Sequence, residues 1–220
     1  MCANFKPIKK IHANQLELFE PTFEYKMDIF PSDDCPLILS HQNELEWRKA
    51  KFGMLPPYAK EIAFKYATYN ARTETVEQKR SFKHAWLNDQ FALIPVEAIY
   101  EPKYINGKAH WYGIFRQDGQ PFTLAAIYEE TLIDEQKVRS MSLLTINADH
   151  HPFMKQFHKP DDEKRSVIVI PDNLRNDWLN CTHSEAKDFF LDMPANEFAS
   201  MPKAEMKNRD GSVNLNNSYK

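Results

Sequence analysis

"HWYGIFRQDGQPFTLAAIYE" (110–129) is the stretch that most clearly indicates the fold. Two runs rich in aromatic and β-branched residues flank the "QDGQ" segment, and such runs favour β-strands. An Asp-Gly pair between two strand-like runs is a typical hairpin turn signal. The stretch therefore predicts two antiparallel strands joined by a turn at 117–120.

Similar reasoning extends outward along the chain. Further strands are predicted at 35–41, 44–55, 91–100, 138–149 and 165–170, and short helices at 14–20, 78–88, 171–180 and 184–191. Pro95 predicts a kink or an edge position within its strand. Strands outnumber helices and mostly follow one another, which predicts a compact, single α+β domain with a mostly antiparallel, barrel-like sheet and short flanking helices. We expect this domain to span 1–202 and a polar, loosely packed tail to span 203–220.

Composition excludes several classes of protein. The chain has 220 residues, is 42% hydrophobic and carries a formal net charge of -3, which argues against a binder with a basic tail but allows a local basic groove. Its three cysteines form no C-x-x-C pair, so neither a disulfide framework nor a structural zinc site is expected. The sequence contains no signal-peptide-like core and no apolar run of membrane-spanning length. These features predict a cytoplasmic protein, without membrane attachment or a cofactor.

Cys2 is the first candidate for chemistry. If Met1 is removed, the cysteine exposes a thiol and an α-amine on adjacent carbons. The free amine has a pKa of about 7.7–8.0 and a free thiol one of about 8.5, so both are nucleophilic near neutral pH. Such a 1,2-aminothiol condenses with an aldehyde through an imine to a thiazolidine ring. The alternative is a chance cysteine in a frayed terminus.

Two further candidates lie in strand-like segments. Asn70 and Arg72 are two residues apart, so both side chains can face the same way on an extended chain, and the arginine fork suits a phosphate. Their alternative interpretation is a solvated strand end. Glu101 follows a buried strand, where an apolar setting raises a carboxyl pKa towards neutrality. It is otherwise a surface residue at a turn.

Histidines gather in "ADHHPFMKQFHKPDDEKR" (148–165). His150 and His151 suggest a metal, but adjacent residues of an extended chain point to opposite sides, so no metal site is predicted. His158 follows an apolar residue and is the better candidate for a general acid or base.

Together these features resemble the SOS response-associated peptidase (SRAP) family of abasic-site-processing, DNA–protein cross-linking proteins. The resemblance is carried by Cys2, "NARTET" (70–75), "LIPVEAIYE" (93–101), "DGQPFTLAAIYE" (118–129), "LLTINAD" (143–149) and a late histidine, in that order. It extends to "MPANEF" (193–198). It implies a compact, β-rich α+β fold with a positively charged groove for single-stranded DNA.

The resemblance also implies roles for individual residues. Cys2, after loss of Met1, captures the ring-opened aldehyde of an abasic site as a thiazolidine, and Asn70 holds the geometry of the cross-link. Glu101 shuttles protons, while His158 assists opening of the deoxyribose ring and reversal of the cross-link. The implied DNA-binding residues are Arg72, Arg80, Lys83 and Arg165. The implied partner is single-stranded DNA with abasic sites, bound by a monomer near the nucleoid.

The chain departs from the family pattern at several DNA-facing positions. Ala3 and Asn4 replace a Gly-Arg pair, and Pro102 stands where the family has tryptophan. Lys164 or Arg165 stands in for the arginine of a His-x-Arg-Met-Pro motif. Two other functions therefore stay open: a non-covalent nucleic-acid-binding module on the same fold, and a cysteine peptidase or autopeptidase that uses Cys2 with His158. A lyase-type activity on abasic sites is a further expectation from the family.

Overall fold

The computed structural model describes residues 2–42, 44–62 and 67–209. The strands are β1 (Phe5–Pro7), β2 (Asp34–His41), β3 (Glu44–Phe52), β4 (Asn70–Arg72), β5 (Phe91–Ile105), β6 (Lys108–Arg116), β7 (Phe122–Ile133), β8 (Gln136–Asn147), β9 (Arg165–Val167), β10 (Val169–Ile170) and β11 (Phe198–Pro202). The α-helices are α1 (Lys83–Leu87) and α2 (Arg175–Asn180), and the 3₁₀ helices are η1 (Lys10–Leu16), η2 (Met154–Gln156), η3 (Asp172–Leu174), η4 (Ala186–Phe189) and η5 (Lys203–Arg209).

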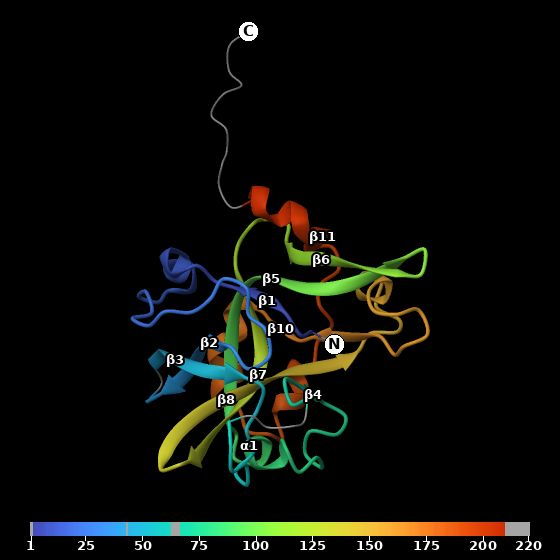
Figure 1. The fold of residues 1–220 in the computed structure, drawn as a ribbon. Coiled ribbons are helices and arrows are strands. Elements are labelled where there is room, and N and C mark those ends of the chain that lie inside the picture. Colours follow the sequence, from blue (N-terminus) through green and yellow to red (C-terminus); the bar gives the residue numbers. More distant parts are fainter. Residues whose placement is uncertain (1, 43, 63–66, 210–220) are drawn as a thin grey trace, which may run out of the picture.

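Five strands close into a barrel. The order is β7-β8-β3-β2-β5, and β5 pairs back onto β7 to complete the ring. All these pairings are antiparallel except β3 with β8. The predicted α+β class, with a mostly antiparallel barrel-like sheet and short helices, is therefore confirmed. Figure 1 shows the helices as short segments around the sheet.

Alternation along the strands explains why both faces of the sheet are buried. On β5, Ala92 and Ile94 belong to one apolar cluster, whereas Phe91 and Leu93 belong to a second cluster that includes the helix tryptophans Trp86 and Trp178. Successive side chains of a strand point to opposite faces, so one face packs against other strands and the other against α1 and α2. A strand buried on both faces reads as a continuous apolar run, as "FALIPV" does.

The strand β5 is also long enough to pair with different strands along its two halves. Residues 91–96 pair with β7 inside the barrel, whereas residues 99–105 pair with β6 outside it. Pro95, which has no N–H to donate, lies beside this change of partner. In Figure 1 the outer half of β5, together with β6, forms an arm that extends from the barrel. This arrangement carries Glu101 away from the barrel wall.

The predicted hairpin at 110–129 is wrong in its pairing. The turn exists, with Gly119 at φ 77° and its N–H donating to the carbonyl of Arg116 at 3.1 Å. However, β6 and β7 pair with consecutive parts of β5 and not with each other. The turn therefore joins β6, which pairs with residues 99–105 of β5, to β7, which pairs with residues 91–96 of β5. The hairpin next to it is closed instead by Asn106 and Gly107, between Ile105 and Lys108.

Other predicted elements differ mainly in length. The helix expected at 14–20 is a 3₁₀ helix at Lys10–Leu16, and that expected at 78–88 is helical only over Lys83–Leu87. The strand predicted at 165–170 is divided, because β9 pairs with β8 whereas β10 pairs with β7.

The chain beyond the expected boundary at 202 is packed for at least four residues. Lys203–Arg209 form η5, and Met206 is 6% exposed. Met206 lies against Gly113, where a Cβ atom would come within 2.8 Å of the methionine side chain. Glycine at 113 thus makes room for the C-terminal segment.

Candidate active site

The N-terminal segment places Cys2 against β5. β1 pairs antiparallel with β5, and the carbonyl of Asn4 accepts a hydrogen bond from the N–H of Tyr100 at 2.9 Å. The Cys2 side chain is 1% exposed, and its Sγ lies 3.5 Å from the carbonyl oxygen of Asn4, to which it donates. Pairing in the sheet thus fixes the cysteine beside the strand that carries Glu101.

Asn70 reaches the same point from β4. This strand runs parallel to β8, and the Nδ2 of Asn70 donates to the carbonyl oxygen of Cys2 at 2.7 Å. The Asn70 side chain is buried, and within the described part of the chain its Oδ1 has no hydrogen-bond partner. A buried amide oxygen without a partner is costly in a native protein and is often found where a ligand binds.

Glu101 and His158 form a buried pair. The Nε2 of His158 lies 2.8 Å from the Oε2 of Glu101, with 7% and 2% of the two side chains exposed. His158 adopts φ 64°, a left-handed conformation that costs energy for a non-glycine residue, and its N–H donates to the carbonyl of Pro102 at 2.6 Å. The Nδ1 atom of His158 is buried, with no partner among the described residues.

Electrostatics connect the cysteine to this pair. Burial raises the pKa of the Cys2 thiol well above its ordinary range, and the negative charge of Glu101 raises it further. The resting thiol is therefore neutral. An imidazole bonded through Nε2–H to a carboxylate keeps an Nδ1 lone pair that can accept a proton. The structure thus brings together all four predicted reactive residues, Cys2, Asn70, Glu101 and His158.

Three of the predicted DNA-binding residues lie on the surface. Arg72 is 46% exposed, and its Nη1 is 2.7 Å from the Oε2 of Glu163. Arg80 stacks over the ring of Tyr58 at 4.2 Å, and Lys83 is exposed at the start of α1. These cations are accessible, although a phosphate must displace Glu163 to reach Arg72.

Arg165, the fourth, is placed differently. Its side chain is 2% exposed, and its two terminal nitrogens bind the two carboxylate oxygens of Glu74 at 2.7 and 2.9 Å. Further bonds reach Glu163 at 2.9 Å and the carbonyl of Thr145 at 2.6 Å. The guanidinium therefore joins β9 and β8 to the segment that follows β4, and does not face solvent.

Asn4, where the chain departs from the family pattern, is held inside the protein. Its Nδ2 donates to Asp28 Oδ1 at 2.6 Å and to the carbonyl of Ile29 at 2.9 Å, while its Oδ1 accepts from Lys203 Nζ at 2.5 Å. Lys203 also bonds to Asp28 at 2.9 Å and lies 4.0 Å from the ring centre of Tyr100.

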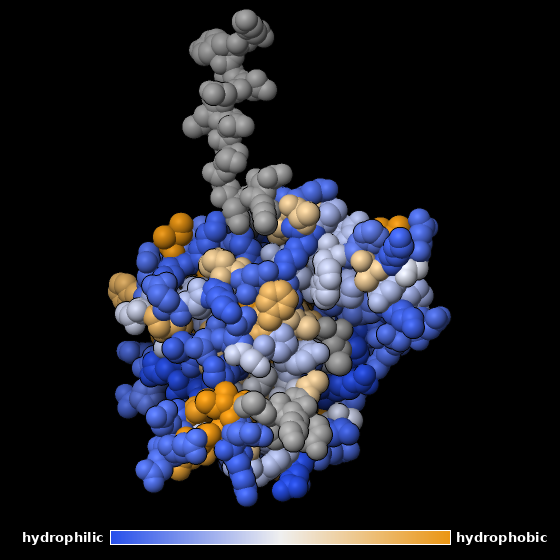
Figure 2. All heavy atoms as spheres, viewed as in Figure 1, coloured by the Kyte–Doolittle hydropathy of each residue, from blue (hydrophilic) through white to orange (hydrophobic). Residues whose placement is uncertain are grey.

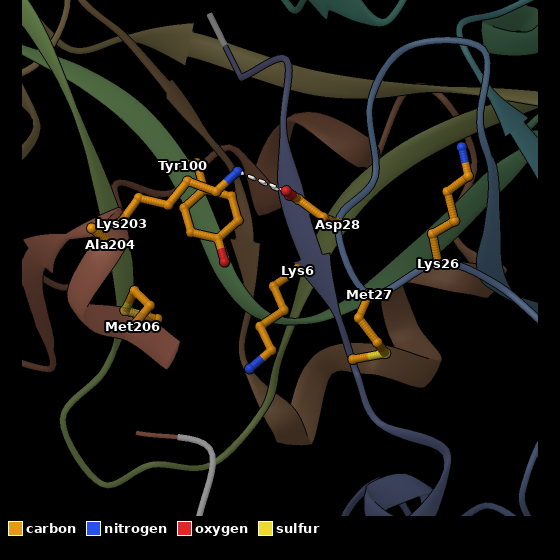
Figure 3. Close-up of a pocket in the computed structure, with 8 residues that line it drawn as sticks. All are labelled: Lys6, Lys26, Met27, Asp28, Tyr100, Lys203, Ala204 and Met206. Atoms are coloured by element: carbon orange, nitrogen blue, oxygen red, sulfur yellow. Dashed lines mark hydrogen bonds and ion pairs between the residues drawn. The ribbon is translucent and has the colours of Figure 1, made fainter. Parts of the chain in front are cut away.

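These contacts form one side of a groove of about 680 Å³, in which Figure 3 shows Lys203 bonded to Asp28. We call the bonds that join Lys203 to Asn4 and Asp28 the clasp. The sequence contains no local signal for it, because residues 4 and 203 are 199 positions apart.

His151 has a structural role. Its Nδ1 accepts hydrogen bonds from the N–H groups of Phe153 and Met154, and its Nε2 lies 2.7 Å from the carbonyl of Met193. Within the described ranges, no group of three or more His, Cys, Asp or Glu side chains is arranged to hold a metal. Across the same ranges, no helix is long and apolar enough to span a membrane.

Comparisons with known proteins agree with this architecture. The family model described as "SOS response associated peptidase (SRAP)" matches residues 1–209. The "Abasic site processing protein YobE" of Bacillus subtilis is 25% identical over 188 residues, which cover 82% of each chain. The "Abasic site processing protein YedK" of Escherichia coli is 27% identical over 137 residues, covering 60% of this chain and 58% of that one. A crystal structure of a protein from Bordetella bronchiseptica superposes with a TM-score of 0.87 at 30% identity, covering 91% of this chain and 99% of that one.

Proposed function

The chain belongs to the SOS response-associated peptidase (SRAP) family, and from this membership and the geometry around Cys2 we propose that it processes abasic sites in DNA. The finer proposal is that Cys2, freed by removal of Met1, forms a covalent thiazolidine with the aldehyde of an abasic site in single-stranded DNA. The observation that carries it is the convergence of Cys2, Asn70 and the Glu101–His158 pair from four separate segments.

The chemistry is a condensation that releases one water molecule. The α-amine of Cys2 adds to the C1′ aldehyde of the opened sugar, and loss of water gives an imine. The thiol then adds to the imine carbon, forming the C–S bond, while its proton moves to nitrogen and closes the ring. Each step transfers a proton, which is the work that a hydrogen-bonded carboxylate and imidazole perform.

Asn70 and the Glu101–His158 pair have different tasks in this scheme. Asn70 holds the Cys2 carbonyl through Nδ2 and leaves Oδ1 free for a hydroxyl of the substrate. The pair takes the thiol proton and passes it to the ring nitrogen, because a thiol that burial keeps neutral needs a base before it can attack. His158 Nδ1, which has no partner within the described part of the chain, can accept the proton of the C1′ hydroxyl as the sugar ring opens.

The surface cations supply the proposed contact with DNA. Arg72 follows Asn70 by two residues on β4, so a phosphate next to the reacting sugar can replace Glu163 on its guanidinium. Arg80 and Lys83, which are exposed just before and at the start of α1, are the other cations of the proposed contact. Arg165 is left out of the proposed DNA contacts, because its side chain is buried and its two terminal nitrogens are bonded inside the protein.

The peptidase alternative has less geometric support. A cysteine peptidase needs an imidazole within hydrogen-bond reach of its thiol. Among the described residues, the Cys2 Sγ is bonded to the Asn4 carbonyl and the imidazole of His158 faces Glu101. The Glu101–His158 pair would have to take the thiol proton in either reaction, so we favour aldehyde capture because the similar curated proteins are named abasic site processing proteins.

The test is incubation with a single-stranded oligonucleotide that contains one abasic site. We expect a denaturant-resistant band and an intact mass equal to that of the Met1-free protein plus the oligonucleotide less one water. Cys2→Ala should abolish the adduct, whereas Cys35→Ala should retain it, since Cys35 is an equally buried free thiol outside the site. An adduct that persists in Cys2→Ala, or none in the wild-type protein lacking Met1, would refute the proposal.

A further inference from the structure

The outer part of β5 and β6 forms an arm that begins at the active site. The two strands pair from Ile99 with Ile114 to Ile105 with Lys108. The partner strand on the far edge of β6, β11, reaches only as far as Tyr112. Figure 1 shows the arm extending past the barrel, towards the upper right.

One face of the arm continues directly from Glu101. Residues directly opposite each other in an antiparallel pair lie on the same face, and so do alternate residues of a strand. Glu101 is opposite Tyr112, Lys103 is opposite His110, and Ile105 is opposite Lys108. Moving outward from the proposed catalytic carboxylate, this face therefore presents an aromatic ring, a lysine, a histidine, an exposed isoleucine and a second lysine.

Contacts at the base of the arm join this face to the site. Lys103 forms a β-bridge with His158, and its Nζ lies 2.8 Å from the Oε1 of Gln156. The same Nζ lies 5.4 Å from the ring centre of Tyr112. The outer residues, Lys108 and His110, are exposed. The arm thus begins next to the Glu101–His158 pair, and its exposed outer residues lie further along the same face.

The charge of the arm differs from that of the rest of the chain. Residues 102–116, "PKYINGKAHWYGIFR", contain no Asp or Glu, although the whole chain has 31 acidic residues and a net charge of -3. Figure 2 shows a largely hydrophilic surface where the arm lies. Cations interleaved with aromatic rings, without a sequence-reading pattern, are typical of surfaces that bind single-stranded nucleic acid.

We propose that this face of the arm binds the nucleotides that flank the abasic site in single-stranded DNA. The inference rests on the proposed function and adds a second contact region to it. Lys103 and Lys108 pair with successive phosphates, while Tyr112 and His110 stack against bases. Four residues of strand separate Glu101 from Ile105, a length of ~13 Å. The contacts are to backbone and ring faces, so they are independent of base sequence.

The test uses Lys108→Gln/His110→Gln, two exposed positions outside the proposed reactive set, and an intact oligonucleotide that cannot react. Removing one phosphate contact should make the salt dependence, log Kd against log[salt], shallower by about 0.7. If the variant and the wild type bind DNA equally at 1 M salt, this difference in slope makes the variant bind about fivefold more weakly at 0.1 M salt. Tyr112→Leu should weaken binding by about fivefold or more through lost stacking. The matched control is Lys137→Gln, which removes a lysine that is 68% exposed on β8 and should leave both values unchanged.

The outcomes separate the two proposals. If the arm variant and Lys137→Gln bind with the same affinity and salt slope, and both still cross-link to abasic DNA, the arm proposal is wrong and the proposed function stands. If the wild-type protein neither binds nor cross-links to DNA, both proposals fail. A loss of affinity in the arm variant, with unchanged cross-linking at saturating DNA, supports the arm as a binding region.

Discussion

Replacing Arg165 by Met should destabilise the protein without changing how its DNA binding depends on salt. The side chain is 2% exposed and makes charge-assisted bonds to Glu74 and Glu163, together with one to the carbonyl of Thr145. Methionine keeps most of the apolar stem but removes every one of these bonds. The experiment therefore separates a buried structural role from the DNA contact that the sequence predicts for this arginine.

The expected loss of unfolding free energy follows from the partners that remain. Removing one member of a buried ion pair costs about 3–5 kcal/mol, largely because the other charge is left without a partner. Here the side chains of Glu74 and Glu163 are 48% and 33% exposed, so water can solvate both carboxylates after the substitution. The Thr145 carbonyl still loses its bond inside the protein. We therefore expect Arg165→Met to lower the free energy of unfolding by about 3 kcal/mol, the lower end of this range.

The pH dependence of the free energy of unfolding provides a second test of the structural role of Arg165. The hydrogen bond from Arg165 lowers the pKa of Glu74, so this interaction stabilises the native state above the unfolded pKa of the carboxyl group. That stability is lost as the pH falls through the lower, native pKa. Urea unfolding should thus show a large difference between wild type and Arg165→Met at pH 7, and a smaller one at pH 3.

Arg72→Met is the matched control, because it removes the same kind of side chain from the surface. Its ion pair with Glu163 is 46% exposed on the arginine side, so the free energy of unfolding should change by less than about 1 kcal/mol. For Arg72→Met, the slope of log Kd for single-stranded DNA against log[salt] should instead become shallower by about 0.7. If Arg165→Met leaves stability within about 0.5 kcal/mol of wild type and lowers the salt slope as Arg72→Met does, the structural role is refuted.

Three other changes have defined outcomes. Glu163→Gln removes the carboxylate that competes with phosphate for Arg72 and should tighten binding of single-stranded DNA by up to about fivefold in anisotropy titrations; unchanged or weaker binding contradicts this. Lys203→Met should lower the unfolding free energy by about 1 kcal/mol in urea, through the lost contact with Asp28, and a neutral result would show that the clasp adds no stability. Burial raises the pKa of the Cys35 thiol, so the thiol ionises only when the protein unfolds, and the free energy of unfolding falls above pH ~8.5. Cys35→Ala should reduce this fall between pH 9 and 10 by up to about 1.4 kcal/mol per pH unit. An equal fall in the variant and the wild type would argue for an exposed thiol.

Local sequence patterns predict the strands well but not their partners. The strands predicted at 35–41 and 138–149 correspond to β2 and β8, since the apolar residues of each strand have to be buried whichever strand it pairs with. The Asp-Gly pair at 117–120 predicts a hairpin because it bends the chain, yet β5 supplies the partner for both flanking strands. Asn106-Gly107, with both residues at positive φ, forms the turn of the observed hairpin between β5 and β6.

The candidate site shows the same division between local and distant information. The order of motifs along the chain pointed to Cys2, Asn70, Glu101 and His158, and the fold brings them together. No local pattern could show that Arg165 is buried, because its partners come from other segments of the chain.

Three of the four proposed reactive residues lie where regular strand pairing begins or ends, and the fourth, Glu101, lies where β5 has changed its partner strand. Asn70 opens a strand of three residues, and Glu101 lies in the part of β5 that has left the barrel. His158 has a left-handed backbone at a single bridge, and Cys2 precedes the short strand β1. A continuous ladder would occupy the backbone groups and fill the space on both sides of the sheet. At these breaks, polar side chains can turn inward while the barrel holds their backbones in place, so the closed sheet provides the rigidity and its interruptions provide the site.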